Sequence, residues 1–448
     1  MKCKYNNKFY LCEVNNTDIL IIGGGASGMM AAITAAEAGK KVILLEKRPN
    51  CGSKLLITGK GRCNMTNMNP WPEFSLHVYN NASFLKPAFY NFSNQDTLDF
   101  FEKSGMPTEV QRGNRAYPAS EKSRDVLDTL LRRLRSLQVD IRYNSSVSSI
   151  TVNNGNGASV ESNGSCFSVS CIDSTSDKIG RHLALAVYTA KALVVATGGL
   201  SYPLTGSTGD GYKFAKELGH KVISTLPSLT ALKPKKYSSE FFNISLRNIR
   251  MDLYVNEEME QSEFGEMTFT NGGIEGALGF RLSRRAVKGV ANGQKVYVIL
   301  DLKPAVSTEQ LKNRLNGIIL DLRIGQREVS NTSERTMKQV LAKFMPRDLI
   351  PPFLSYNQGM NLEKLPLALK NWRFDITGYV GYERCVITNG GVSINEISRK
   401  TMESKKVAHL YFAGEIIDLD ADTGGYNLQI AFSTGVLAGR SAAEDLLK

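Results

Sequence analysis

Residues 18–47 read "DILIIGGGASGMMAAITAAEAGKKVILLEK" and place an alanine-rich helix between two apolar runs. The first run, Ile19–Ile22, has the length of a buried parallel strand. A turn of the pattern G-x-G-x-x-G follows it, formed by Gly23, Gly25 and Gly28. The second run ends at Glu46. This order of strand, glycine-rich turn, small-residue helix, strand and acid predicts a dinucleotide-binding βαβ unit.

Each part of this turn has a physical role. Gly23 permits the tight turn, Gly25 lets a pyrophosphate approach the backbone, and Gly28 lets the helix pack close to the sheet. The N-terminus of the helix that follows offers free N–H groups and a positive dipole end to the phosphates, and Ala26 and Ser27 lie in the turn that leads into it.

Glu46 is placed to accept hydrogen bonds from the ribose of an adenosine. Its charge would repel a 2′-phosphate, which favours FAD or NAD over NADP. Two later stretches, "ALVVATGG" at 192–199 and "HLYFAGE" at 409–415, are also strands that run into glycine. Such strands indicate close backbone approach to one long ligand at the carboxyl edge of a sheet. An extended FAD needs these further elements, whereas a simple nicotinamide dehydrogenase does not.

The first and last of these motifs lie almost 400 residues apart, so the binding domain is predicted to be discontinuous. We expect an α/β, Rossmann-like FAD-binding domain made of residues 1–220 and 376–448. Residues 221–375 are predicted to form an inserted β-barrel-like domain that shapes the substrate pocket, with a helical insert at about 305–360.

Composition narrows the class of protein. The chain of 448 residues has a net charge of +12, but its cations are spread out. The cluster "RRLR" at 132–135 lies on an amphipathic helix and is interpreted as a solvated face, so we expect no nucleic-acid partner. No apolar run approaches the roughly 18 residues of a membrane span. Seven scattered cysteines and the absence of a signal peptide favour a cytoplasmic protein with no membrane partner.

The chain resembles the two-dinucleotide-binding-domain flavoproteins, and more closely the BaiN-type family of bacterial NAD(P)/FAD-dependent oxidoreductases. That family includes 3-dehydro-bile-acid Δ4,6-reductases and aminoacetone oxidases. The matching blocks are spread over nearly the whole chain: "GGGASGMMAAI", "KLLITGKGRCNMTN", "RAYPAS", "ATGGLSYPLTGSTGDGYKFAKELGH", "FTNGGIEG", "VITNGGVSINEI" and "LYFAGEIIDLDADTGGYNLQIAFSTG". The resemblance implies an FAD-dependent enzyme, but the activities of family members differ.

The loop "TGKGRCNMTN" at 58–67 lies where such flavoproteins send a chain segment along the cofactor. Gly61 lets the backbone approach, and Arg62 and Asn64 can donate to the pyrophosphate or the flavin. Lys54 or Lys60 adds positive potential, which favours an anionic reduced flavin. The alternative interpretation is a surface turn with solvated cations.

The double glycine Gly424–Gly425 precedes another small-residue helix, and we expect its backbone to meet the reactive end of the flavin. Glu415 is assigned to ribityl or ribose hydroxyls. The expected cofactor-binding residues are Gly23, Gly25, Ala26, Ser27, Gly28, Glu46, Lys47, Lys54, Gly61, Arg62, Cys63, Asn64, Val147, Thr197, Gly198, Gly199, Gly414, Glu415, Gly424, Gly425, Tyr426, Asn427 and Leu428.

Cys63 is interpreted as a packing or hydrogen-bonding residue, because Cys51 is twelve residues away and outside the spacing of a redox pair. The four histidines show no metal-binding spacing, so no metal is expected. The sequence identifies no catalytic acid or base.

The sequence therefore predicts an FAD-dependent oxidoreductase that moves a hydride between the flavin and a small organic molecule or NAD(P)H. No second glycine-rich fingerprint is present, so NADH or NADPH would act as a transient electron donor. Reduction of a conjugated C=C bond is favoured over oxygen-dependent oxidation of an amine or alcohol. A flavin-containing RNA-modification protein, which would use the +12 charge, and a redox sensor are alternatives of another class.

Overall fold

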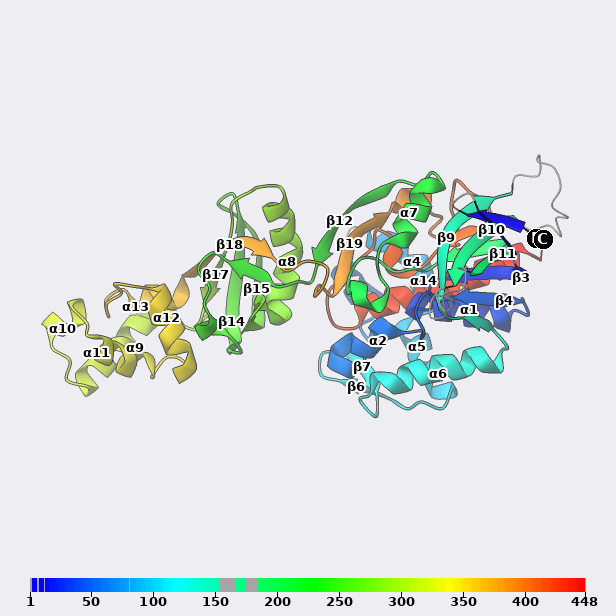
Figure 1. Cartoon of the computed structure of the whole chain (residues 1–448). Helices are drawn as coiled ribbons and strands as arrows, with labels where there is room; N and C mark the ends of the chain where they lie inside the picture. Colours follow the sequence, from blue (N-terminus) through cyan, green and yellow to red (C-terminus); the bar gives the residue numbers. More distant parts are fainter. Residues whose placement is uncertain are drawn as a thin grey trace. The chain divides into compact units, whose positions relative to one another are not determined.

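The computed structural model describes residues 2–5, 8–11, 13–79, 81–153, 166–173 and 184–447. The chain forms two compact units (Figure 1). Unit 1 is Met1–Thr225 with Ile387–Lys448, and unit 2 is Leu226–Val386. The sequence placed the second boundary at 375, which falls inside the strand β18 (Trp372–Tyr379). The sequence pattern changes from helix to strand near 372 because β18 is the last strand of the barrel of unit 2, so this change does not mark the boundary between the units.

The centre of unit 1 is a seven-stranded sheet of order β8-β4-β3-β11-β10-β9, in which β20 also pairs with β11. The strands β8, β4, β3, β11 and β20 run parallel, and β9 and β10 add an antiparallel hairpin. Their bounds are β3 Glu13–Ile22, β4 Val42–Leu45, β8 Asp140–Arg142, β9 Ser145–Val152, β10 Phe167–Asp173, β11 Ala184–Val195 and β20 Leu410–Phe412.

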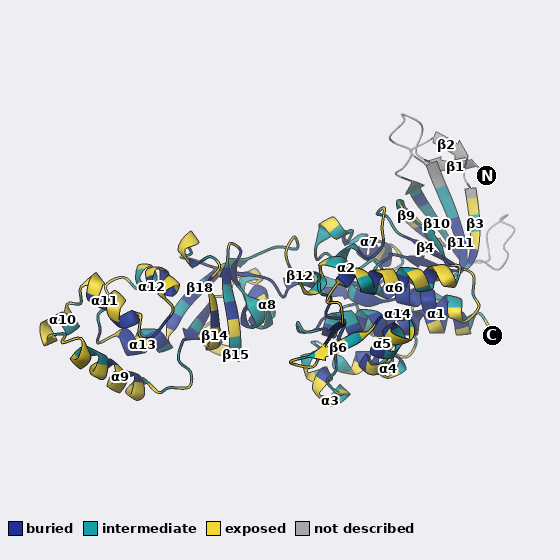
Figure 2. Cartoon of the chain, turned by 90° about the horizontal axis from the view of Figure 1, so that it is seen from below, coloured by how far each residue is buried: buried dark blue, intermediate teal, exposed yellow. Residues whose placement is uncertain are grey.

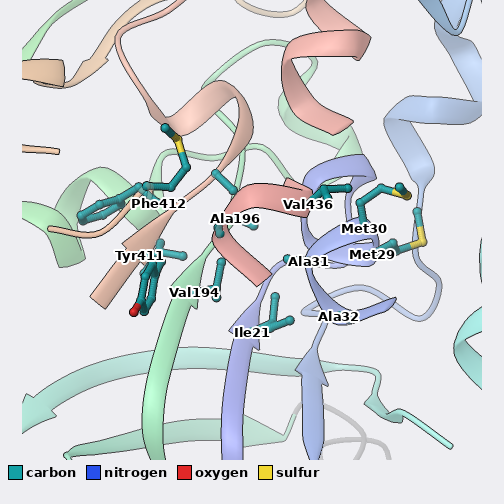
Figure 3. Packing of buried hydrophobic residues seen from close by; sticks show 14 of the residues in the cluster. Ile21, Met29, Met30, Ala31, Ala32, Val194, Ala196, Tyr411, Phe412 and Val436 are labelled. Atoms are coloured by element: carbon teal, nitrogen blue, oxygen red, sulfur yellow. The ribbon is translucent and has the colours of Figure 1, made fainter. Parts of the chain in front are cut away.

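Two helices made of small residues pack closely over this sheet. They are α1 (Ala26–Glu37) and α14 (Tyr426–Asp445). A Cβ on Gly435 would lie 2.3 Å from the backbone oxygen of Ser27, and one on Gly439 would lie 2.3 Å from that of Ala31. Figure 3 shows side chains of α1, β3, β11 and β20 in the core that results. The glycines of α14 therefore fix how the last helix of the chain contacts the first.

Smaller elements surround this core in unit 1. The helix α6 (Ser123–Ser136) buries Val126, Leu127, Leu130 and Leu134 and exposes Arg132 and Arg135, as its amphipathic pattern predicts (Figure 2). The others are β1 Lys2–Tyr5, β2 Lys8–Leu11, α2 Ser53–Ile57, β5 Thr66–Asn67, α3 Trp71–Phe74, α4 Ala82–Asn91, α5 Asn94–Lys103, β6 Thr108–Gln111, β7 Arg115–Pro118, α7 Asp210–Glu217 and β19 Ile387–Val392. The strand β12 (Val222–Ser228) pairs with β19 where the chain passes between the units.

Unit 2 is a closed six-stranded barrel of order β13-β16-β15-β14-β17-β18, which confirms the predicted barrel-like insert. Its other strands are β13 Leu232–Pro234, β14 Ser245–Val255, β15 Glu258–Thr270, β16 Gly273–Glu275 and β17 Val296–Asp301. Its helices are α8 Gly276–Ala291, α9 Thr308–Asp321, α10 Gln326–Ser330, α11 Glu334–Leu341, α12 Ile350–Tyr356 and α13 Leu365–Lys370. The last five lie between β17 and β18, close to the predicted helical insert at about 305–360.

Candidate functional site

The parallel strands of unit 1 end in one row, which we call the carboxyl edge. Ile22 of β3 pairs with Val195 of β11, which pairs in turn with Phe412 of β20. Leu45 of β4 continues the row beside Ile22. The loops that leave this row are the glycine-containing segments that the sequence assigned to one ligand. In open parallel sheets, ligands bind outside this edge.

Two glycines of the first turn are required by the protein's own packing. Gly23 has a φ of +107°, and a Cβ there would lie 2.5 Å from the backbone oxygen of Ala196. A Cβ on Gly28 would lie 1.9 Å from the backbone oxygen of Gly23. Gly25 differs, because no atom lies within 4 Å of the position of its Cβ. The space at Gly25 is thus left open at the start of α1, as a phosphate-binding turn requires.

Glu46 holds the turn from the adjacent strand. Its carboxylate accepts a hydrogen bond from the backbone N–H of Gly24 and one from that of Arg48, both at 2.8 Å. Burial raises the pKa of this carboxyl group, and the two N–H donors oppose that effect. Each carboxylate oxygen keeps a lone pair for a further donor. The sequence predicted the ribose contact of Glu46 but not its bonds to the turn.

Val147 lies beside this region, on β9. The backbone N–H of Ser145 donates to the backbone oxygen of Glu46 at 3.0 Å, so β9 begins next to the end of β4. Lys47 lies on the other side of Glu46 in the chain, where its Nζ contacts Asp210 Oδ2 at 2.6 Å. Lys47 is therefore ion-paired with the start of α7 within the protein.

A second polar cluster joins the loops after β11 and β20. Lys54 Nζ lies 2.6 Å from Glu415 Oε2 and 2.8 Å from Ser201 Oγ. Glu415 Oε1 accepts from the hydroxyl of Ser201 and from the backbone N–H of Thr388. A Cβ on Gly199 would lie 2.9 Å from Glu415 Oε1. Lys54 and Glu415 thus act as a pair, and their charges offset each other at this position.

The loop at 58–67 is a compact coil in which several residues have positive φ. They are Gly59, Lys60, Gly61 and Cys63. The side chain of Arg62 turns toward the β6–β7 hairpin: Nη2 donates to Gln111 at 2.6 Å and to Glu121, and the guanidinium lies 4.4 Å from the centroid of the Tyr117 ring. Arg62 therefore positions the loop through side-chain contacts within the protein.

Cys63 is fully buried, and burial raises the pKa of its thiol, so the thiol stays neutral. Two polar atoms on the predicted cofactor loops are buried without a hydrogen-bond partner. They are Asn64 Oδ1 and Thr197 Oγ1. Buried polar atoms are normally paired, so such orphans indicate a missing partner such as a ligand. Together with the open space at Gly25, they fit a dinucleotide cofactor at the carboxyl edge.

The segment before α14 is held by the amide of Asn427. Its Oδ1 accepts from the N–H of Ala421 at 2.8 Å, and its Nδ2 donates to the carbonyls of Ala421 and Asp422. Gly425 has a φ of +100°, and a Cβ there would lie 2.3 Å from the carbonyl carbon of Thr66. The absence of a side chain at Gly425 is thus required by the protein's own backbone, independently of any ligand.

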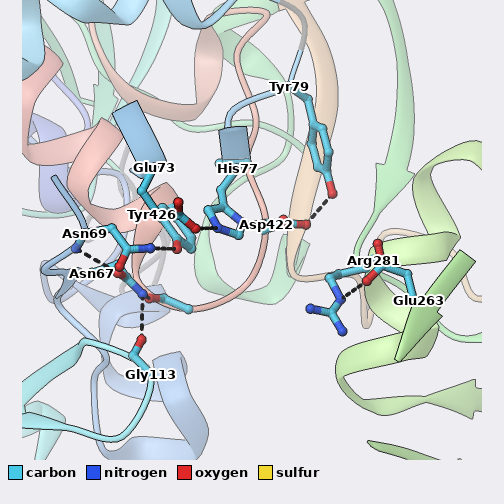
Figure 4. Close-up of polar contacts among 12 residues, drawn as sticks. Asn67, Asn69, Glu73, His77, Tyr79, Gly113, Glu263, Arg281, Asp422 and Tyr426 are labelled. Atoms are coloured by element: carbon cyan, nitrogen blue, oxygen red, sulfur yellow. Dashed lines mark hydrogen bonds and ion pairs between the residues drawn. The ribbon is translucent and has the colours of Figure 1, made fainter. Parts of the chain in front are cut away.

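Three side chains that the sequence did not single out meet beside this segment (Figure 4). His77 Nδ1 lies 2.8 Å from Asp422 Oδ2, and the hydroxyl of Tyr79 donates to Asp422 Oδ1. The ring of His77 stacks on that of Tyr426, with ring centroids 4.5 Å apart and an angle of 22° between the ring planes. We call His77, Tyr79 and Asp422 the 77–422 cluster. It escaped sequence reasoning because its members lie 345 residues apart.

Most of the residues that the sequence assigned to the cofactor lie at the carboxyl edge or in its loops. Some of their side chains contact other parts of the protein. Ser27 Oγ turns toward the backbone oxygen of Ala413, at 3.4 Å. Gly198, with a φ of +74°, and Gly414, with a φ of +78°, follow the row directly. Tyr426 is buried at the start of α14, and burial raises its pKa to about 12. Leu428 is partly buried and packs against the core of unit 1.

Comparison with known proteins places this site in a family. The sequence model of the HI0933-like protein Rossmann domain matches residues 17–441. The chain belongs to the HI0933-like family. It is 30% identical to a 3-dehydro-bile acid Δ(4,6)-reductase of Clostridium scindens, over 95% of this chain and 98% of the relative. It is 28% identical to a ribosomal RNA dihydrouridine synthase of Escherichia coli, over 96% of this chain and 98% of the relative.

A solved structure shares the fold of this HI0933-like chain. The 3-ketosteroid-Δ4-(5α)-dehydrogenase of Rhodococcus jostii RHA1 aligns with a TM-score of 0.53 and 13% identity, over 99% of this chain and all of that one. The predicted Rossmann-like flavoprotein fold is thereby confirmed, and the HI0933-like chain is a flavin-dependent oxidoreductase. Among the described residues, no helix is long and apolar enough to cross a membrane.

Proposed function

We propose that this protein uses FAD to reduce a C=C bond conjugated to a carbonyl group. The observation that carries the proposal is the carboxyl edge itself, where the open space at Gly25 and the unpaired atoms of Asn64 and Thr197 fit an extended dinucleotide. Bound FAD supplies two electrons as hydride, and the protein supplies binding, orientation and protons.

Different residues of the carboxyl edge and its loops are assigned to successive parts of the cofactor. The open turn at Gly25 and the start of α1 receive the pyrophosphate, and Glu46 accepts from the adenosine ribose. The Lys54–Glu415 pair lies nearer the ribityl chain and offers both a donor and an acceptor. The first turn of α14 places unpaired N–H groups and a positive dipole end where negative charge develops during reduction.

The reaction class follows from what the relatives share. A Δ(4,6)-reductase of 3-dehydro bile acids acts on a C=C bond conjugated to a ketone, and a dihydrouridine synthase reduces the uracil C=C bond that is conjugated to a ring carbonyl. Both substrates accept hydride at the carbon β to the carbonyl and a proton at the α-carbon. An α,β-unsaturated carbonyl compound is therefore the substrate class that we assign to this protein.

A reduced nicotinamide nucleotide is the proposed electron donor, docking transiently because the chain has a single glycine-rich fingerprint. Oxygen-dependent oxidation of an amine or alcohol is the competing direction. It predicts rapid reaction of the reduced enzyme with oxygen and slow reaction with unsaturated carbonyl compounds.

A second candidate substrate of the same class is a uracil ring in RNA, and a cavity in unit 1 favours it. This cavity of about 330 Å³ carries the cations Arg399, Lys400 and Lys405. Asn81 and Ser83 also line the cavity, and they follow Tyr79 of the 77–422 cluster by two and four residues in the sequence. A basic cavity close to the candidate site suits a phosphate of a nucleic acid.

The experiment that tests the function starts with the visible spectrum of the purified protein and the flavin released on denaturation, where intact FAD is expected. Anaerobic titration with NADH and NADPH then identifies the donor. Turnover is measured with a 3-oxo-Δ4,6 bile acid, 2-cyclohexen-1-one and a uridine-containing ribosomal RNA fragment. Saturated products support the proposal, and release of FMN alone or no product from any acceptor would contradict it. Salt-sensitive turnover of the RNA, lost in Lys400→Glu, would select RNA.

A further inference from the structure

Reduction of a conjugated C=C bond requires a proton donor, and the 77–422 cluster has the arrangement of one. His77 Nδ1 is held at 2.8 Å by Asp422 Oδ2, and the other ring nitrogen, Nε2, lies 3.9 Å from Glu73 Oε1. A carboxylate at Nδ1 fixes the tautomer and the orientation of the ring. Among the described residues, this pairing and the stacking on Tyr426 determine how the ring is oriented.

The backbone holds the cluster at the segment that leads into α14. The N–H of Asp422 donates to the backbone oxygen of His77 at 2.9 Å, and the N–H of Tyr79 donates to that of Asp420 at 2.8 Å. Val78 and Ala421 form a β-bridge between these bonds. The segment 77–79 is therefore fixed against 420–422, two residues before the double glycine that precedes the helix.

His77 is the more exposed member of its pair with Asp422. The side chain of Asp422 is 11% exposed, whereas that of His77 is 29% exposed. The charged and titratable groups that face the His77 ring are Asp422, Glu73 and Tyr426, with Glu73 Oε1 3.9 Å from Nε2. Tyr79 and Arg115 influence the ring indirectly. Tyr79 donates a hydrogen bond to Asp422, and the charge of Arg115 acts on Tyr426.

We propose that His77, oriented by Asp422, donates the proton that completes reduction of the conjugated C=C bond. This inference rests on the proposed function. In the step, the C=C π bond breaks, hydride forms the new C–H bond at the β-carbon, and the proton from His77 Nε2 forms the new C–H bond at the α-carbon. The hydride derives from a reduced nicotinamide nucleotide by way of the flavin. Neutral His77 then regains a proton from water at its exposed edge.

The test compares His77→Gln and Asp422→Asn with the matched control His409→Gln. His409 makes the same Nδ1 contact, to Asp445 Oδ2 at 2.7 Å, at the amino end of β20. The FAD-loaded, reduced enzymes are mixed without oxygen with the acceptor that the wild type turns over, and reoxidation of the flavin is followed. Reduction by the nicotinamide donor is measured separately, since it needs no proton from His77.

We expect both cluster variants to retain FAD and to be reduced at the wild-type rate, but to be reoxidised by the acceptor on the order of 10²-fold more slowly. His409→Gln should be unchanged. Wild-type reoxidation should show a solvent deuterium isotope effect, and His77→Gln should lose it. Normal reoxidation in His77→Gln, or loss only in Tyr79→Phe, would overturn the assignment of His77. A wild-type enzyme that no acceptor reoxidises would instead refute the proposed function, and this inference with it.

Discussion

A similar trio of side chains lies at each end of α14: one lies beyond the carboxyl edge, which contacts the helix at Thr434, and the other lies where β20 begins. At the start of α14, His77 and Tyr79 contact Asp422 beside Tyr426. At its end, His409 and Tyr411 contact Asp445. The spacing of histidine and tyrosine is the same in both, and a helix of 20 residues spans about 30 Å. The residue types alone therefore do not determine which cluster has a chemical role.

The surroundings distinguish the two clusters. The 77–422 cluster lies between the 3₁₀ turn Ser75–His77 and the segment before α14, next to Gly424 and Gly425, which both have positive φ. The second cluster lies where β20 begins, and Glu403 accepts from the backbone N–H of His409 at 2.9 Å. We interpret it as a tie between the end of α14 and the sheet. Position relative to the direction of the parallel strands is the feature that separates a candidate site from a structural contact.

The largest effect should come from filling the open space at the carboxyl edge. Gly25→Val should abolish retention of FAD, because its side chain occupies the place assigned to the pyrophosphate. Stability of the flavin-free protein should change by no more than about 0.5 kcal/mol, since no protein atom is displaced. The matched control is Gly317→Val in α9, which is equally open and should keep FAD. Retention of FAD by Gly25→Val in gel filtration would remove the basis for placing the cofactor here.

At the C-terminal end of α14, a substitution is expected to reduce stability without slowing the reaction, which is the opposite of the effect expected for Asp422→Asn. Asp445→Asn should lower the free energy of unfolding by about 1 kcal/mol, because it weakens the hydrogen bonds to His409 and Tyr411. Flavin reoxidation by the acceptor should stay at the wild-type rate. Chemical denaturation and single-turnover kinetics on the same preparation check both expectations. A kinetic defect in Asp445→Asn larger than that of Asp422→Asn would reverse the roles assigned to the two clusters.

A further effect, on the redox potential of the flavin, concerns the Lys54–Glu415 pair. Glu415→Gln leaves the charge of Lys54 unbalanced near the flavin and should raise the midpoint potential, and Lys54→Met should lower it. Each shift should be on the order of 30 mV, or about 1.4 kcal/mol for a two-electron couple. Glu415→Gln should also weaken retention of FAD. Spectroelectrochemical titration measures the potentials, and shifts of the same sign in both variants would contradict the pairing.

Much of the fold could be predicted because its signals are local. The strand Ile19–Ile22, the turn at Gly23 and the helix after it lie within one short stretch, and the structure matches them. The barrel and its helical insert were also predictable from changes in pattern. The boundary predicted at 375 falls inside β18, whereas unit 2 ends at Val386, because the strand pattern of β18 resembles that of the strands of unit 1.

The side-chain geometry of the site was less accessible to sequence reasoning. The contact of Asp422 with His77 joins residues 345 positions apart, and no spacing rule connects them. The sequence attributed Gly425 to the flavin, but the structure shows that the backbone of Thr66 already excludes a side chain there. A glycine in a motif indicates that a side chain does not fit at that position. Only the packing shows whether the space of the missing side chain is occupied by protein atoms or by a ligand.

The most direct test of the central claim is a single turnover of the reduced enzyme without oxygen. Protein reduced by one equivalent of NADH or NADPH is mixed with a 3-oxo-Δ4,6 bile acid, 2-cyclohexen-1-one or the RNA fragment, and the visible absorbance of the flavin is recorded. At least one acceptor is expected to restore the oxidised spectrum and to yield one equivalent of saturated product. Reoxidation by oxygen alone, with every conjugated acceptor unreacted, would contradict it.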